Sequence, residues 1–227
     1  MAASEDRARA RAGGRRVAAP EERPLPPEPE RGAGEVRRVA HAAFPTLFGE
    51  FTLIGFEDRK ADSELTAVVR GDVRDAADCP VRVHSECHTG DIFGSLRCDC
   101  REQLEESLRY IAARDCGAVI YLRQEGRGIG LLNKIRAYHL QDQGLDTVTA
   151  NERLGFPADV RDYRVAARII DLLGIVSVRL MTNNPAKIAG LQREGIAVTG
   201  RIPVVVPANH VNGSYLATKR TRLGHLP

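Results

Sequence analysis

The sequence contains no run of apolar residues approaching the roughly 18–20 that are needed to span a bilayer. Its amino terminus also lacks the apolar core of a secretory signal peptide. Residues 1–40 hold one serine and seven acidic residues, whereas organelle transit peptides are rich in serine and poor in acids. Cysteine is scarce, and an odd count of five without an export signal argues against a disulfide framework. We therefore expect a cytoplasmic protein with reduced thiols and no membrane partner.

The sequence also has no large excess of positive or negative charge, because the net charge is only +3 over 227 residues. Such a weak excess does not predict a nucleic-acid partner. Residues 1–40 carry nine of the 33 basic and seven of the 30 acidic residues, which leaves 24 and 23 in the remainder. The proline-rich stretch 20–29 has almost nothing to bury. We expect a disordered tail over 1–40, rich in Ala, Arg, Pro and Glu, and a nearly neutral folded domain over 41–227 in which any anion site is local.

From about residue 41 the apolar pattern is typical of a globular domain. Strands are predicted at 46–56 (a pair broken at a glycine), 65–70, 81–85, 117–122, 176–181 and 202–206, and helices at 101–114, 129–140, 163–173, 185–193 and near the carboxyl terminus. Strands come first and strands alternating with helices follow. This order favours an α/β fold, a layered α/β/α domain with a mixed sheet.

Three of the five cysteines fall within fourteen residues, at Cys87, Cys98 and Cys100. Cys98 and Cys100 can direct both sulfur atoms at one ion if the turn between them is tight, and zinc is the natural ion for such a thiolate cluster. Three ligands leave a position for water, as in catalytic sites, whereas a fourth protein ligand closes a structural site. His84 and His88 are both near enough to be that ligand, so the spacing leaves both arrangements open. Three buried thiols that pack as small apolar side chains are the alternative.

Two polar turns follow predicted strands. The turn over 123–134 has glycines at positions 126, 128 and 130 and opens a helix, where backbone N–H groups favour an anion. It matches neither the P-loop nor the dinucleotide fingerprint. The loop over 183–187 lies at the carboxyl end of a strand, where ligands of α/β sheets usually bind. Taken alone, the first turn is equally well explained as a plain connection, and the second is better explained that way.

Together these motifs resemble the GTP cyclohydrolase II family. The resemblance rests on Arg82-Val-His-Ser-Glu-Cys87, Ser95-Leu-Arg-Cys-Asp-Cys100, Arg123-Gln-Glu-Gly-Arg127, Leu131-Leu-Asn-Lys-Ile-Arg-Ala-Tyr138 and Leu180-Met-Thr-Asn-Asn-Pro-Ala-Lys187, and it extends from about residue 41 to His225. It implies an enzyme of riboflavin biosynthesis that opens the imidazole ring of GTP. Formate and pyrophosphate leave, and a diaminopyrimidinone ribosylamino phosphate remains. A homodimer and magnesium bound with the triphosphate are implied as well.

The resemblance also implies roles for individual residues. Zinc is held by Cys87, Cys98 and Cys100, with water as the fourth ligand. The nucleotide is bound by Arg82, Val83, His84, Ser85, Glu86, Gln103, Glu125, Gly126, Arg127, Thr147, Thr182 and Lys187. The catalytic residues are Asp159 as proton acceptor, Arg161 as nucleophile and Tyr138 as an aid at the ring. Because a guanidinium stays protonated and has no lone pair, we interpret Arg161 as a clamp on the α-phosphate.

Arg101 departs from the family pattern, which usually has glycine after the second cysteine of the pair. Three alternative functions have different requirements. A paralogue on the same scaffold stops at the formamidopyrimidine, but Tyr138 favours the full reaction because deformylation needs a second, proton-managed attack by water. A non-catalytic zinc-stabilised module that binds a nucleotide or RNA requires a fourth protein ligand and a broad basic surface. A redox protein requires a Cys-x-x-Cys spacing, which the sequence lacks.

Overall fold

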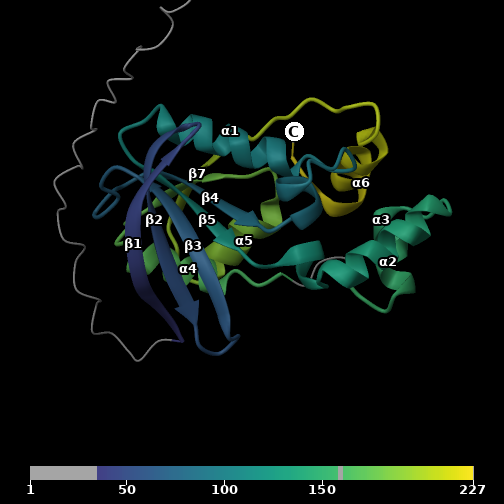
Figure 1. Cartoon of the computed structure of the whole chain (residues 1–227), viewed down its shortest axis with the longest axis horizontal. Coiled ribbons are helices and arrows are strands. Elements are labelled where there is room, and N and C mark those ends of the chain that lie inside the picture. The colour runs from purple at the N-terminus through teal and green to yellow at the C-terminus, as the bar shows by residue number, and fades with distance from the viewer. Residues whose placement is uncertain (1–34, 158–160, 227) are drawn as a thin grey trace, which may run out of the picture.

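The computed structural model describes residues 35–157 and 161–226, and its centre is a seven-stranded mixed sheet (Figure 1). The strands are β1 (Val36–Thr46), β2 (Gly49–Asp58), β3 (Ser63–Arg70), β4 (Cys79–Ser85), β5 (Gly117–Leu122), β6 (Val178–Met181) and β7 (Val198–Ile202). Their spatial order is β1-β2-β3-β5-β4-β6-β7. Pairing is antiparallel from β1 to β5 and parallel from β5 through β4 and β6 to β7. The predicted α/β class with a mixed sheet is confirmed.

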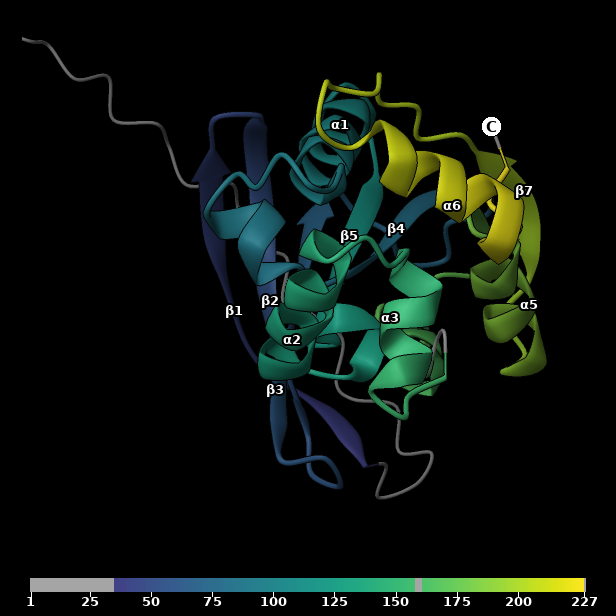
Figure 2. The same ribbon diagram turned by 90° about the vertical axis from the view of Figure 1, so that its right-hand side faces the viewer.

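Helices flank the sheet on both faces, and others lie beyond one end of its strands (Figures 1 and 2). They are α1 (Cys100–Ala112), α2 (Leu131–Asp142), α3 (Thr147–Arg153), α4 (Arg164–Leu172), α5 (Pro185–Arg193) and α6 (Gly213–Leu223), with a π-helical turn η1 (His88–Ile92) and a 3-10 turn η2 (Glu125–Gly128). α2, α3 and α6 lie beyond the carboxyl-terminal ends of the parallel strands. Within the described residues, none of the helices is long and apolar enough to cross a membrane.

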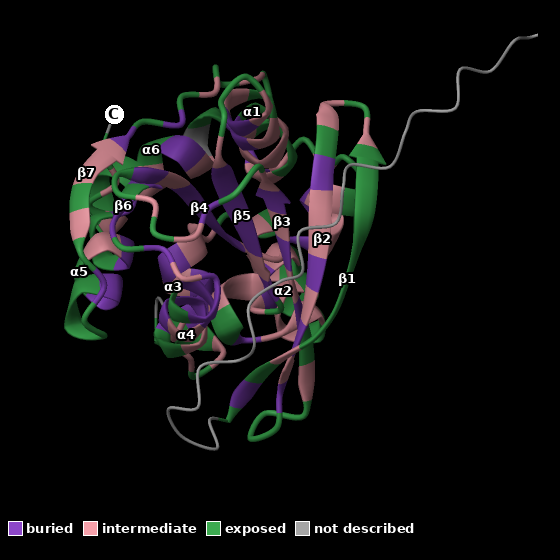
Figure 3. Ribbon diagram, turned by 90° about the vertical axis from the view of Figure 1, so that its left-hand side faces the viewer, coloured by how far each residue is buried: buried purple, intermediate pink, exposed green. Residues whose placement is uncertain are grey.

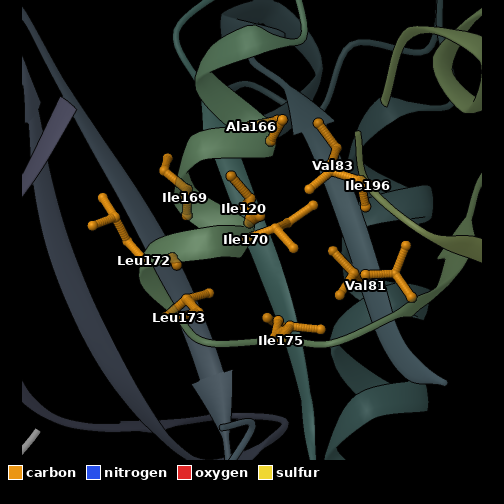
Figure 4. Packing of buried hydrophobic residues seen from close by; sticks show 14 of the residues in the cluster. Val81, Val83, Ile120, Ala166, Ile169, Ile170, Leu172, Leu173, Ile175 and Ile196 are labelled. Carbon is orange, nitrogen blue, oxygen red and sulfur yellow. The ribbon is translucent and has the colours of Figure 1, made fainter. Parts of the chain in front are cut away.

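The core is divided between the two faces of the sheet. Ile120 of β5 faces the larger cluster beneath α4, whereas its neighbour Val119 faces the smaller cluster beneath α1, as alternation along a strand requires. Ile169 and Ile170 of α4 are fully buried in the larger cluster with Val81 of β4 (Figure 4), and burial runs along the central strands (Figure 3). Each such side chain contributes about 1.5–3 kcal/mol by leaving water. This packing fixes the parallel strands, and hence the loops at their ends.

The first strand begins earlier than composition suggests. β1 starts at Val36, five residues before the domain boundary expected at residue 41. It is an edge strand and most of its side chains are exposed (Figure 3), so no alternating apolar pattern marks it. It still pairs with β2 along its length, from Val36 opposite Asp58 to Thr46 opposite Gly49. Residues 1–34, which make up most of the expected tail, lie outside the described residues.

The prediction for the last strand was wrong by several residues. β7 covers Val198–Ile202, whereas the apolar pattern predicted a strand over 202–206. Pro203 has no N–H group to donate to a strand ladder. The next N–H, that of Val204, donates to Oδ1 of Asn183 at 3.0 Å, so the backbone leaves the sheet at this point. Val204 is nevertheless buried in the smaller core cluster, which explains the apolar pattern that misled the prediction.

Candidate active site

A cavity lies where the parallel strands β4, β5 and β6 end, the edge at which α/β sheets usually bind ligands. Sixteen of the eighteen predicted site residues line it: Arg82, His84, Ser85, Glu86, Cys87, Cys98, Cys100, Gln103, Glu125, Gly126, Arg127, Tyr138, Thr147, Arg161, Thr182 and Lys187. Val83 does not, because its side chain is buried in the core beneath α4. Asp159 lies outside the described residues.

The structure brings the three predicted cysteines into one sulfur cluster. The Sγ atoms of Cys87, Cys98 and Cys100 all lie within 4.8 Å of one another, and Cys87 and Cys98 are separated by 3.6 Å. A tetrahedral zinc ion with Zn–S bonds of about 2.3 Å separates its sulfur ligands by about 3.8 Å, so the donor set fits this ion. Gly90 leaves the room that the cluster needs, because a Cβ atom there would lie 2.8 Å from Sγ of Cys98.

A buried ion pair adjoins the sulfur cluster. Nζ of Lys134 lies 3.0 Å from Sγ of Cys87 and 2.9 Å from Oε1 of Glu125, and the lysine and glutamate side chains are 12% and 8% exposed. Hydrogen bonds with Cys100 and Cys98, and then the Lys134 ammonium, lower the pKa of Cys87 despite burial. Burial lowers the pKa of Lys134, but the charges of Cys87 and Tyr138 and the hydrogen bonds to Glu125 and Cys87 together outweigh it, and the net shift is upward. The cluster therefore favours a thiolate at Cys87.

Among the described residues, the group of potential metal ligands consists of the three cysteines. The nearby histidines, His84 and His88, do not belong to it. Nε2 of His84 lies 3.0 Å from Oδ2 of Asp91, and its ring stacks on Tyr121 with centroids 5.4 Å apart. Burial lowers the pKa of His84 although Asp91 raises it. The ring of His88 packs edge-on against Phe93. Three protein ligands are the arrangement of a catalytic zinc site with an open position.

The glycine-rich turn η2 has a strained backbone. Gly126 and Arg127 both have a backbone φ angle of 62°. This lies in the left-handed region, which residues other than glycine seldom adopt. A Cβ atom on Gly126 would also lie 2.9 Å from Ile129. Strain of this kind persists where the surrounding structure enforces it, and such positions cluster at ligand sites. The turn brings Arg127 to the cavity wall.

Unpaired polar atoms gather around this cavity. Seven buried side-chain polar atoms of the described residues lack a hydrogen-bond partner, and five come from cavity residues: Nε of Arg82, Nδ1 of His84, Oγ of Ser85, Oε1 of Gln124 and Nη1 of Arg127. Buried polar atoms are normally paired, so these mark places where a ligand supplies the partner. Six basic side chains line the same cavity, Arg82, Arg127, Lys134, Arg161, Lys187 and Lys219, against two acidic ones, Glu86 and Glu125. The cavity therefore suits a polar, anionic ligand.

Two cations of the cavity, Arg82 of β4 and Lys187 of α5, are held in place by backbone carbonyl groups and by Gln103. Arg82 is 6% exposed, and its guanidinium donates to the carbonyl oxygen of Met181 at 2.9 Å and to Oε1 of Gln103 at 2.7 Å. Burial lowers the pKa of Arg82 to about 10. Nζ of Lys187, which is 4% exposed, donates to the carbonyl oxygen of Val83 at 2.6 Å. Both cations are thus positioned before any ligand binds.

Tyr138 and Arg161 line the cavity as well. The hydroxyl of Tyr138 lies 3.4 Å from Oγ1 of Thr89, and the guanidinium of Arg97 stands 4.8 Å from the centre of the ring. Burial raises the pKa of Tyr138 to about 12, so the phenol is protonated at neutral pH and can donate a hydrogen bond.

Several cavity residues lie outside the set predicted from the sequence: Gln124, Ile129, Lys134, Ala137, Gln141, Asn151, Asn183, Asn184, Tyr215, Lys219 and His225. Asn151 belongs to α3, a helix of seven residues that is too short for an apolar period and is signalled only by its N-cap, Asp146. Lys219 belongs to α6, within the segment 215–219 to which the family resemblance extends, but it is not among the predicted site residues. Arg101, the departure from the family pattern, is exposed on α1, where its Nε donates to Oε1 of Glu105 at 3.1 Å, and it does not line the cavity.

The fold and the cavity together define a class of protein, an α/β enzyme with a cysteine cluster able to hold a metal ion beside a basic cavity. A sequence profile of the GTP cyclohydrolase II family matches residues 37–203, and the chain belongs to this family of hydrolases.

Named relatives agree with this assignment. The chain is 53% identical to GTP cyclohydrolase-2 of Picrophilus torridus over 185 residues, which are 82% of this chain and 96% of that protein. It is 53% identical to the riboflavin biosynthesis protein RibBA of Bacillus mycoides over 191 residues, which are 84% of this chain and 48% of that protein. For RibBA of Synechocystis sp. the identity is 52% over 192 residues, 84% of this chain and 34% of that protein. The chain thus spans about half or less of the length of these RibBA proteins.

Proposed function

We propose that this chain is a zinc-dependent GTP cyclohydrolase II. It opens the imidazole ring of GTP, releases formate and pyrophosphate, and leaves a diaminopyrimidinone ribosylamino phosphate, the first step of riboflavin biosynthesis. One observation carries the proposal: three cysteine sulfurs within 4.8 Å of one another share a cavity with six basic side chains and five unpaired buried polar atoms. A purine triphosphate needs both features, because its phosphates require cations and its C8 atom requires a strong nucleophile.

Cys87, Cys98 and Cys100 would hold the zinc ion. Zinc with three protein ligands and an open position supplies a hydroxide nucleophile near neutral pH. Three thiolates exceed the charge of a divalent ion by one, and the Lys134 ammonium 3.0 Å from Sγ of Cys87 offsets that excess. Tyr138 is protonated at neutral pH, so we assign it a hydrogen bond that assists at the ring.

The basic wall would bind the triphosphate. Arg161 clamps the α-phosphate and stabilises the charge that develops as pyrophosphate leaves. Nη1 of Arg127 has no partner among the described residues and is available for a phosphate oxygen. Magnesium accompanies the triphosphate. Asp159 stays the predicted proton acceptor, and the remaining predicted nucleotide contacts, the homodimer and the cytoplasmic location stay predictions.

The proposal is tested by incubating the zinc-loaded chain with GTP and magnesium while formate, pyrophosphate and the mass of the pyrimidine product are measured together. We expect formate, pyrophosphate and the deformylated pyrimidine in equal amounts. Cys98→Ser should abolish formate release. Cys116→Ser is the matched control, because Cys116 does not line the cavity, and it should retain the activity. Accumulation of a formamidopyrimidine would identify the shorter reaction, and absence of ring opening would contradict the proposal.

A further inference from the structure

The carboxyl-terminal segment completes the cavity although it lies beyond the residues that the family profile matches. The family profile ends at residue 203, yet Tyr215, Lys219 and His225 line the cavity. These residues belong to α6 and to the turn that follows it. Figure 2 shows α6 beside α1, across the end of the sheet. The segment therefore forms part of the wall of the cavity.

Backbone contacts fix the segment on the site at both of its ends. Asn212, just before α6, is 1% exposed, and its Nδ2 donates to the carbonyl oxygen of Cys98 at 3.4 Å. After α6, the N–H of Leu226 donates to the carbonyl oxygen of Asn183 at 2.8 Å. α6 is thus joined to the turn that carries two of the cysteines and to the loop after β6.

The closest link is an ion pair with the residue between those two cysteines. Nζ of Lys219 lies 2.5 Å from Oδ1 of Asp99, and the two side chains are 11% and 7% exposed. Asp99 stands at the N-cap position of α1, but its carboxylate makes no capping hydrogen bond. Its other oxygen accepts a hydrogen bond from Nε2 of Gln103 at 2.6 Å. One carboxylate oxygen therefore pairs with α6 and the other with the Gln103 side chain of α1, and neither caps the backbone of α1.

The pair balances charge next to the sulfur cluster. Without Lys219, the buried carboxylate of Asp99, the residue between Cys98 and Cys100, would have only the neutral amide of Gln103 as a side-chain partner. A buried charge without its counter-charge is costly, and groups that orient metal ligands commonly change metal affinity when they are replaced. The same Gln103 side chain binds Arg82, so the link continues from α6 into the basic wall of the cavity.

We propose that Lys219 is a positioning residue, which through Asp99 holds the Cys98–Cys100 turn in the arrangement that retains zinc. The inference rests on the proposed function in one respect, the presence of zinc on the three cysteines. It adds a requirement for α6, which lies outside the family profile, in the binding of that ion.

The test measures zinc affinity by chelator competition on the full, zinc-loaded chain. We expect Lys219→Met to weaken zinc binding about 10–100-fold, and Asp99→Asn to weaken it as well, because each leaves one buried charge unpaired. The double variant leaves neither charge, so it should bind zinc no more weakly than either single variant. Lys219→Arg keeps the charge and should remain closest to wild type. Lys60→Met is the matched control, because Lys60 pairs with Glu35 on an exposed surface.

The outcomes separate this inference from the proposed function. Wild type that binds no zinc contradicts both. Wild type that binds zinc, with Lys219→Met binding it equally well, contradicts only the role of Lys219. Losses that multiply in the double variant would show that Lys219 does not act through Asp99, and would overturn the proposal. If Lys219→Met does not fold, Lys219→Arg and Asp99→Asn decide the question. In each folded variant, the visible spectrum of the cobalt-substituted protein should change with zinc affinity, since it reports the geometry of the thiolate ligands.

Discussion

Replacing Lys134 by methionine tests the electrostatics of the sulfur cluster. Lys134 is 12% exposed, and its ammonium lies 3.0 Å from Sγ of Cys87 and 2.9 Å from Oε1 of Glu125. Methionine keeps most of the apolar stem and removes the charge. The carboxylate of Glu125 then stays buried beside a cluster that carries one excess negative charge when zinc is bound. Both groups lose the same counter-charge in a single substitution.

The size of the effect follows from this burial. Removing one partner of a buried ion pair costs about 3–5 kcal/mol, because the other charge remains uncompensated. We therefore expect the free energy of unfolding of Lys134→Met to fall by at least about 3 kcal/mol. Zinc affinity should fall in the same variant by about 10–100-fold, since the ammonium favours the thiolate form of Cys87.

Urea unfolding followed by circular dichroism measures the first quantity, and chelator competition measures the second. Lys60→Met is again the control: its Nζ lies 3.2 Å from Oε1 of Glu35, but the two side chains are 60% and 57% exposed. An exposed pair contributes about 0–1 kcal/mol, so this variant should stay close to wild type. The reasoning is refuted if Lys134→Met is as stable, and binds zinc as tightly, as Lys60→Met.

Three further predictions concern the core, the response to pH and the triphosphate. Ile170→Ala should lower the free energy of unfolding, measured by urea denaturation, by about 2–5 kcal/mol, because Ile170 is fully buried. Val176→Ala is the control and should have little effect, because the Val176 side chain is 61% exposed. Equal losses of stability in the two variants would contradict the packing described. Burial, followed by the charges of Lys219, Arg127 and Arg161, lowers the pKa of His225 from 6.5 to about 4, so the unfolded chain binds a proton that the folded chain does not. Wild type should therefore lose more stability than His225→Gln as the pH falls from 6.5 to 4, and parallel curves would exclude this role. Arg161→Lys should retain measurable pyrophosphate release because charge is the main requirement, whereas a phosphoramidate trapped on Arg161 would show covalent attack instead.

Features that are local or periodic could be predicted from the sequence. Ala166, Ile169, Ile170 and Leu173 recur at helical spacing and are buried, so α4 was predictable. The cysteines at 87, 98 and 100 are concentrated in one short segment, and the structure brings their sulfur atoms together. The class of fold followed from the order of strands and helices. For the helix and the cysteine cluster, the signal lies within a window of about 18 residues or fewer.

Features set by distant contacts left no such signal. β1 is an exposed edge strand without apolar alternation, and its place depends on pairing with β2. Asp99 and Lys219 are separated by 120 residues, and nothing in either neighbourhood indicates the other. The buried pair of His84 and Asp91 is near in sequence, but it depends on the π-helical turn η1, whose conformation the sequence does not reveal. Polar contacts of this kind have no period, so only the folded chain displays them.

The central claim, a zinc ion on three thiolates with one open position, is tested most directly by X-ray absorption spectroscopy at the zinc edge, combined with metal analysis of the purified chain. We expect one zinc ion per chain, three sulfur ligands at about 2.3 Å and one light ligand without the scattering of an imidazole ring. A chain that binds no stoichiometric zinc, or a zinc ion closed by a histidine as the fourth protein ligand, would contradict the account.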